Sequence, residues 1–78
     1  MGRRENQYRY QLLQQYLQEG WVVDPPVFVR SEWAIQQKDR HTYHFILKRA
    51  KRLDLLAIPR SEELETFVRE QELRLSYL

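Results

Sequence analysis

The first quarter of the chain has the spacing of an amphipathic helix. There is no proline or glycine between Glu5 and Glu19. The apolar positions recur at spacings of three, four and five residues, which places them on one stripe of a helix. They are Tyr8, Leu12, Leu13, Tyr16 and Leu17. Gly20 follows, and glycine commonly ends a helix because it adopts the left-handed conformation without strain. The pattern predicts a helix over about residues 5–19.

The chain then changes to the alternation that is typical of β-strands. Regular pairing is expected only after the Pro-Pro pair, because proline cannot donate a ladder hydrogen bond. From there Val27 and Val29 fall on one side of an extended chain and Phe28 falls on the other. The alternation predicts a strand over residues 27–35, and the polar run 36–40 is predicted to be a loop.

Two further strands are predicted after this loop. Residues 42–49 repeat the alternation, with Phe45 and Leu47 on one side and Ile46 on the other. Residues 53–58 are short, dense in aliphatic side chains and closed by a proline. Because only a few basic residues separate the two runs, we expect a tight hairpin between them.

The last part of the chain begins with a helix start signal. Ser61 is a good N-cap, and three glutamates follow over the positive end of a helix. The buried stripe of this helix would consist of Leu64, Phe67 and Val68. The pattern predicts a helix over about residues 61–72. Residues 73–78 either continue it or turn back as a tail against the core.

Together these elements predict one small α+β domain over residues 1–78. Its order is helix, three-stranded antiparallel meander, helix, in two layers with both helices on one sheet face. The length of 78 residues allows one core. With 42% hydrophobic and 31% charged residues and a net charge of +2, the chain is expected to fold.

Composition also indicates the cellular setting. There is no cysteine, so the chain has neither a disulfide nor a thiolate zinc site, which favours a cytoplasmic location. The longest uninterrupted apolar run has four residues, from Leu55 to Ile58. Neither a membrane span nor a signal peptide is therefore expected.

The residue patterns of enzymes and metal sites are missing from the sequence. His41 and His44 are the only histidines, and residues three apart on a strand face opposite sides unless one of them lies in a loop. The five glutamates of the second helix are explained by its cap and its solvated face. No nucleophile motif or phosphate-binding glycine loop occurs. We predict a protein that is not an enzyme, needs no cofactor or metal and has no evident small-molecule substrate.

The charges are unevenly distributed. Residues 30–60 carry eight basic and three acidic residues, whereas residues 61–78 carry two basic and five acidic ones. Four of the basic residues cluster at the tip of the predicted hairpin. They are Lys48, Arg49, Lys51 and Arg52. Such a cluster suits contacts to nucleic-acid phosphates without base recognition. The alternative is that these cations only protect a sheet edge from pairing with other chains.

The outer face of the predicted sheet provides a second candidate surface. If both helices cover one face, the opposite face exposes an apolar patch made of Phe28, Ile46 and Leu56. Charged residues would surround the patch, namely Arg30, His44, Lys48 and Asp54. A patch of this kind on a small domain indicates contact with a protein partner or self-association as a homodimer. In the alternative interpretation, the tail 73–78 folds over it.

Over about residues 8–71, the order of elements resembles the double-stranded-RNA-binding domain. In that family a loop histidine between the first two strands enters a minor groove, and His41 lies in the corresponding stretch. A Ser-Lys-Lys motif that opens the last helix of the family contacts phosphates, whereas this chain has Ser61, Glu62 and Glu63. Because the glutamates would repel phosphates, the resemblance implies a scaffold that has lost RNA binding and kept protein contacts.

Overall fold

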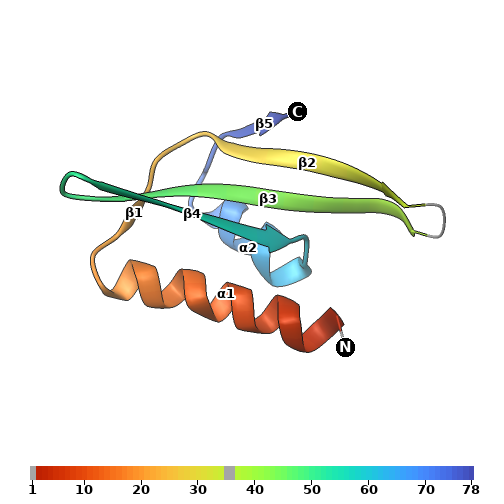
Figure 1. Cartoon of the computed structure of the whole chain (residues 1–78), viewed down its shortest axis with the longest axis horizontal. Helices are drawn as coiled ribbons and strands as arrows, with labels where there is room; N and C mark the ends of the chain where they lie inside the picture. The colour runs from red at the N-terminus through yellow and green to blue at the C-terminus, as the bar shows by residue number, and fades with distance from the viewer. Residues whose placement is uncertain (1, 35–36) are drawn as a thin grey trace.

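The computed structural model describes the backbone of residues 2–34 and 37–78 and the side chains of residues 8–31 and 41–78. Over these residues the protein is an α+β domain with two helices and a five-stranded sheet (Figure 1). The elements are α1 (Gly2–Gln18), β1 (Val22–Val23), β2 (Val27–Ala34), β3 (Gln37–Arg49), β4 (Arg52–Pro59), α2 (Glu62–Glu70) and β5 (Leu75–Tyr77). The predicted class is confirmed, but the sheet has five strands where the sequence predicted three.

Helix α1 ends as its sequence predicts. Gly20 has a φ of 97°, and its N–H donates to the carbonyl of Leu17 at 3.2 Å. The next N–H, that of Trp21, donates to the carbonyl of Tyr16 at 3.0 Å. This pair of hydrogen bonds is the Schellman motif, which usually brings an apolar contact with it. Here the rings of Tyr16 and Trp21 meet edge to face, with centroids 5.4 Å apart.

Strand β3 lies in the middle of the sheet. It pairs with β4 on one side, and on the other side it pairs with β2 and, further along, with β1, all antiparallel. Between β1 and β2 the N–H of Asp24 donates to the carbonyl of Ile46 at 2.7 Å. Strand β5 runs parallel to β2 on its far side. Strand β4 therefore forms one edge of the sheet, and β5 and the short β1 lie at the opposite edge (Figure 1).

The β2–β3 hairpin is longer than the sequence predicts. Strand β3 begins at Gln37, which pairs with Ala34, and His41 pairs with Ser31. Most of the predicted loop 36–40 is therefore strand, while residues 35–36 lie outside the described part of the chain. The prediction was wrong because it relied on apolar alternation. An antiparallel ladder needs only backbone groups and extends without an apolar face.

The core lies on one face of the sheet. Seven strand residues, each at most 6% exposed, point to it: Val27, Val29, Tyr43, Phe45, Leu47, Leu56 and Ile58. Leu13 of α1 and Leu64 and Val68 of α2 join the same cluster. Both helices therefore pack on this face, and Figure 1 shows them together on one side of the sheet. The rings of Tyr10 and Phe67 connect the two helices edge to face at 6.2 Å.

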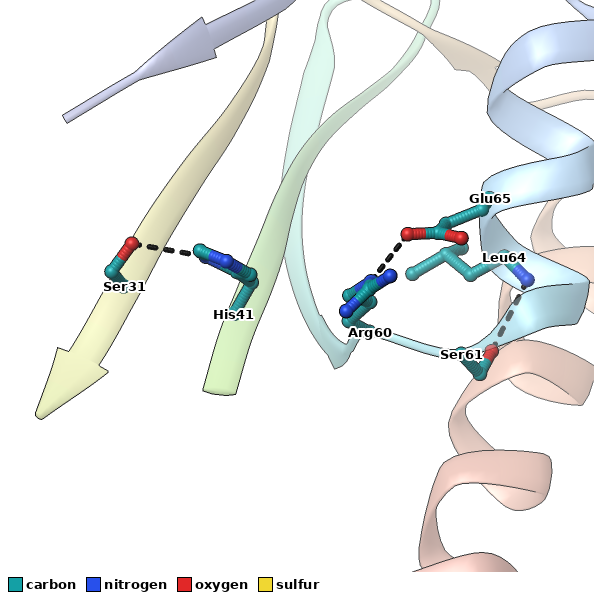
Figure 2. A network of polar contacts seen from close by, with 6 residues as sticks. All are labelled: Ser31, His41, Arg60, Ser61, Leu64 and Glu65. Atoms are coloured by element: carbon teal, nitrogen blue, oxygen red, sulfur yellow. Dashed lines mark hydrogen bonds and ion pairs between the residues drawn. The ribbon is translucent and has the colours of Figure 1, made fainter. Parts of the chain in front are cut away.

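Helix α2 has a distinct cap at each end. The hydroxyl of Ser61 accepts a hydrogen bond from the N–H of Leu64 at 3.1 Å, as expected for an N-cap (Figure 2). At the other end Glu72 has a φ of 52°, and the N–H of Leu73 returns to the carbonyl of Val68 at 3.0 Å. This is a second Schellman motif, with a glutamate at the position that usually holds glycine.

The C-terminal residues extend the sheet. The carbonyl of Arg74 accepts from the N–H of Val27 at 2.8 Å, and the N–H of Leu78 donates to the carbonyl of Val29 at 2.9 Å. Residues 73–78 thus neither continue the helix nor fold over a sheet face. None of the helices in the described residues is long and apolar enough to cross a membrane.

Candidate functional site

The sheet face opposite the helices is defined by the strand register. Directly paired residues lie on the same face, and successive residues alternate. Phe28 pairs with His44, and Ile46 pairs with Leu55. Lys48 pairs with Leu53 on one side and with Val22 on the other. We call this surface the outer face; its members include Val22, Phe28, Arg30, Thr42, His44, Ile46, Lys48, Leu53, Leu55 and Ala57.

The outer face exposes large aliphatic side chains. Leu55 is 74% exposed, Leu53 66% and Val22 58%, and Ile46 lies half-buried between them. Strand β5 only adds to the rim, because its Ser76 pairs with Phe28. In the part of the chain that the structure describes, neither the helices nor the C-terminal strand covers this face (Figure 1).

The placement of Leu56 corrects the sequence prediction. Phe28 and Ile46 lie on the outer face, but Leu56 pairs with Phe45 on the core face and is only 6% exposed. Leu55 occupies the place on the outer face that was expected for Leu56. The physical reason is the two-residue turn between Arg49 and Arg52, which sets the face of every residue in β4.

Asp54 also lies on the core side, where it connects β4 to α1. It pairs with Leu47, and its Oδ2 accepts a hydrogen bond from the hydroxyl of Tyr16 at 2.5 Å. This hydrogen bond is the main reason why the pKa of Tyr16 lies above its ordinary value, and burial raises it further. The sequence analysis had placed Asp54 at the rim of the outer patch, so this assignment was wrong.

The hairpin cations gather at one end of the sheet, as expected. Arg49 and Arg52 are directly opposite each other, and Lys51 lies in the turn next to Ala50, which has a φ of 53°. Lys48 belongs to the outer face, beside Leu53. All four cations are exposed, and among the described residues none of them forms an ion pair. The tip therefore presents positive charge next to the exposed aliphatic side chains.

The free edge of β4 is occupied by side chains. In a hairpin with a two-residue turn, hydrogen-bonded and non-bonded pairs alternate from the turn, so Leu55 and Ala57 direct their backbone groups away from β3. The N–H of Leu55 donates to Oδ1 of Asp54 at 2.9 Å. The carbonyl of Ala57 accepts from the guanidinium of Arg9 in α1 at 3.2 Å. These bonds block part of the edge against addition of another strand.

The two histidines do not converge. His41 lies within β3 on the side of the core, and its Nδ1 is 2.9 Å from the hydroxyl oxygen of Ser31 (Figure 2). His44 lies on the outer face. Within the described residues, no group of three or more histidines and carboxylates is placed to hold a metal ion. The sequence did not predict the Ser31–His41 contact, because it depends on the extension of β3 beyond residue 42.

Contacts of Arg60 attach the start of α2 to the sheet. The backbone N–H of Arg60 donates to the carbonyl of His41 at 2.9 Å. The Arg60 guanidinium forms an ion pair with Glu65 (Figure 2). Behind this pair an open depression of about 420 Å³ lies between α2 and the sheet, with Tyr43 in its wall. Burial raises the pKa of Tyr43 above its ordinary value. The Arg60 contacts hold the start of α2 against the sheet.

Comparison of the chain with protein-family models, curated proteins and solved structures found no match. The resemblance to the double-stranded-RNA-binding domain therefore depends on element order alone. Strands β1 and β5 are additions to that order, and the two glutamates that follow Ser61 open α2.

Proposed function

We propose that this chain is a non-enzymatic interaction module that binds a protein partner through the outer face. The observation that supports this proposal is the continuous exposure of Leu53, Leu55 and Val22 around Ile46. Together with Phe28 and Ala57 in the next row, these residues span three strand positions and three rows of side chains. At strand spacings of about 4.8 Å and a rise of about 3.3 Å per residue, the patch covers roughly 300 Å².

A patch of this size is at the scale of the largest apolar patches on monomeric proteins, which are often functional. On a chain of 78 residues it is a large share of the surface. The cysteine-free composition fits a module that works in the cytoplasm. Self-association is one form that this contact can take, and the experiment below distinguishes it from binding to another protein.

The test uses a photo-crosslinking amino acid at position 55. Because Leu55 is already 74% exposed, this replacement is expected to leave the fold intact. We expect crosslinking to a partner protein or to a second copy. The unlabelled wild-type chain should compete with this crosslinking, whereas unlabelled Leu55→Glu should not. The matched control places the crosslinker at Glu63, on the exposed side of α2. Equal crosslinking from both positions, or a partner that binds Leu55→Glu unchanged, would contradict the proposal.

The second candidate function is binding of nucleic-acid phosphates by the hairpin tip. It is supported by four exposed cations that form no ion pair among the described residues, with Arg49 directly opposite Arg52. Four phosphate contacts predict that log K falls by about 3.6 for each tenfold increase in salt. Arg52→Gln should lower this slope by about 1, whereas Arg74→Gln, an exposed arginine outside the hairpin, should not. Binding that does not depend on salt would exclude this mode.

A further inference from the structure

Building on the proposed function, we infer that the occupant of the outer face is an acidic amphipathic helix of a partner protein. The helix would lay its apolar stripe on Leu53, Leu55 and Ile46, with carboxylates directed to the cations at either end of the face.

The charge of the outer face selects an acidic partner. Arg30 lies at one end, and Lys48 lies at the other end next to the hairpin cations. His44 lies on β3 between these two ends of the face. Among the residues whose side chains the structure describes, Asp24, next to Ile46, is the acidic residue at the margin of this face. Because positive groups flank the apolar patch on both ends, a partner with glutamates or aspartates on both sides of its apolar stripe gains attraction and faster association.

The edge of β4, the strand that carries Leu53 and Leu55, argues against a strand as the occupant. A strand that joins a sheet needs free backbone groups along an edge. On β4 the N–H of Leu55 and the carbonyl of Ala57 already bond to Asp54 and Arg9, and Pro59 has no N–H. The other face of this sheet is covered by two helices, and the open face offers the same kind of surface to a third.

A second copy of this chain fits the surface poorly. Two outer faces packed together would oppose Arg30 and Lys48 with the same cations of the other copy. A helix donated by another copy would have to be α1 or α2, whose apolar stripes lie in their own core apart from the exposed Tyr8 of α1. The exposed side of α2 contributes Glu62 and Glu63, and no large hydrophobic side chain of α2 is exposed. The acidic helix must therefore come from another protein.

The dimensions fit a short helix. The apolar patch is about 20 Å long, which corresponds to about 13 helical residues at 1.5 Å per residue. An interface of roughly 300 Å² on each side is small, at the scale of transient contacts, so we expect fast exchange and an affinity that depends on salt.

The experiment is a selection of peptides against the full chain. One displayed library contains 14-residue helical peptides with randomised faces, and a second contains extended peptides that include proline. Leu55→Glu serves as the counter-selection target. We expect the helical library to yield peptides with an apolar residue every three or four positions and flanking Asp or Glu. A synthesised peptide from this set should shift the amide signals of Leu53, Leu55 and Ile46.

Two variants distinguish the inference from the proposed function. Lys48→Glu should weaken the selected peptide about fivefold or more, since it replaces an attraction by a repulsion of similar size, and Glu63→Lys on α2 should not. If Leu55→Glu abolishes binding but the selected peptides lack acidic residues or come from the extended library, the outer face is used and the helix inference is wrong. If no selected peptide depends on Leu55, both are wrong. Binding of anionic phospholipid vesicles that depends on Leu55, without any acidic peptide, would also overturn the inference.

Discussion

Leu55 and Leu56 are adjacent in sequence but differ in burial, which makes a direct test of the structure. Leu56 is 6% exposed and belongs to the core cluster, whereas Leu55 is 74% exposed on the outer face. Each is replaced by alanine in a separate variant. The two substitutions remove the same atoms from the same strand, so the difference between them depends on the face alone.

The expected decrease in the free energy of unfolding follows from the buried fraction of each leucine side chain. Complete burial of a leucine side chain stabilises a protein by about 2 kcal/mol. The side chain of Leu56 contributes nearly all of this stabilisation, because it is almost fully buried. Leu56→Ala also leaves a cavity beside Phe45, so this variant should lose about 3 kcal/mol in free energy of unfolding. Leu55 has only about a quarter of its surface covered, so Leu55→Ala should cost about 0.5 kcal/mol. The free energies of unfolding of the two variants should differ by about 2.5 kcal/mol.

The assay is urea unfolding at 25 °C, followed by the fluorescence of the tryptophans, one of which, Trp21, packs against Tyr16. If Leu56→Ala leaves too little folded protein, Leu56→Val and Leu55→Val give the same comparison with smaller losses. Equal losses, or a greater loss for Leu55→Ala, would refute the reasoning. A greater loss for Leu55→Ala would mean that β4 pairs with β3 one residue out of the described register and that its two faces are exchanged. Equal losses would mean that the two leucines do not differ in burial.

Two further predictions concern the C-terminal end of α2 and the hydroxyl of Tyr16, which donates a hydrogen bond to Asp54 of β4. Glu72→Gly should raise the free energy of unfolding by about 1 kcal/mol, because glycine adopts the φ of 52° without strain and a negative charge is removed from the C-terminal end of α2. Glu72→Gln removes only the charge, so it should raise the free energy of unfolding by less in the same urea assay. The hydrogen bond to Asp54 raises the pKa of Tyr16 above its ordinary 10.0, so the folded chain keeps this proton at a pH where the unfolded chain loses it. Stability should therefore be unaffected by this group below about pH 10 and should fall as the pH rises through the folded pKa. Urea midpoints measured from pH 8 to 11 should fall less steeply for Tyr16→Phe, and an unchanged slope would count against this assignment.

Local signals in the sequence predicted much of the fold. Gly20 ends α1 and Ser61 starts α2, because each cap depends on one residue type and its immediate neighbours. The alternation in β2 and the second half of β3 predicted the core side of both strands, since each has one apolar face that is buried. These signals do not depend on the rest of the chain.

The face of β4 could not be read from the sequence. Leu53 and Leu55 have one parity and Leu56 and Ile58 have the other, so the apolar pattern is equally compatible with both faces. The register is set by a turn at Ala50, where the sequence has none of the residues that usually mark such turns. Strand β5 was missed for a related reason, because its three residues are held by pairing with a strand far away in sequence.

The same ambiguity in β4 connects the fold to the proposed function. Leu56 and Ile58 belong to the core, whereas Leu53 and Leu55 lie outside it and leave apolar surface exposed to water. The hydrogen bonds to Asp54 and Arg9 block part of the edge of β4, while the adjacent face stays apolar. Protection against strand pairing at the edge, together with an open apolar face between cations, is what a surface for helix docking requires. Strand addition would require the reverse, an open edge.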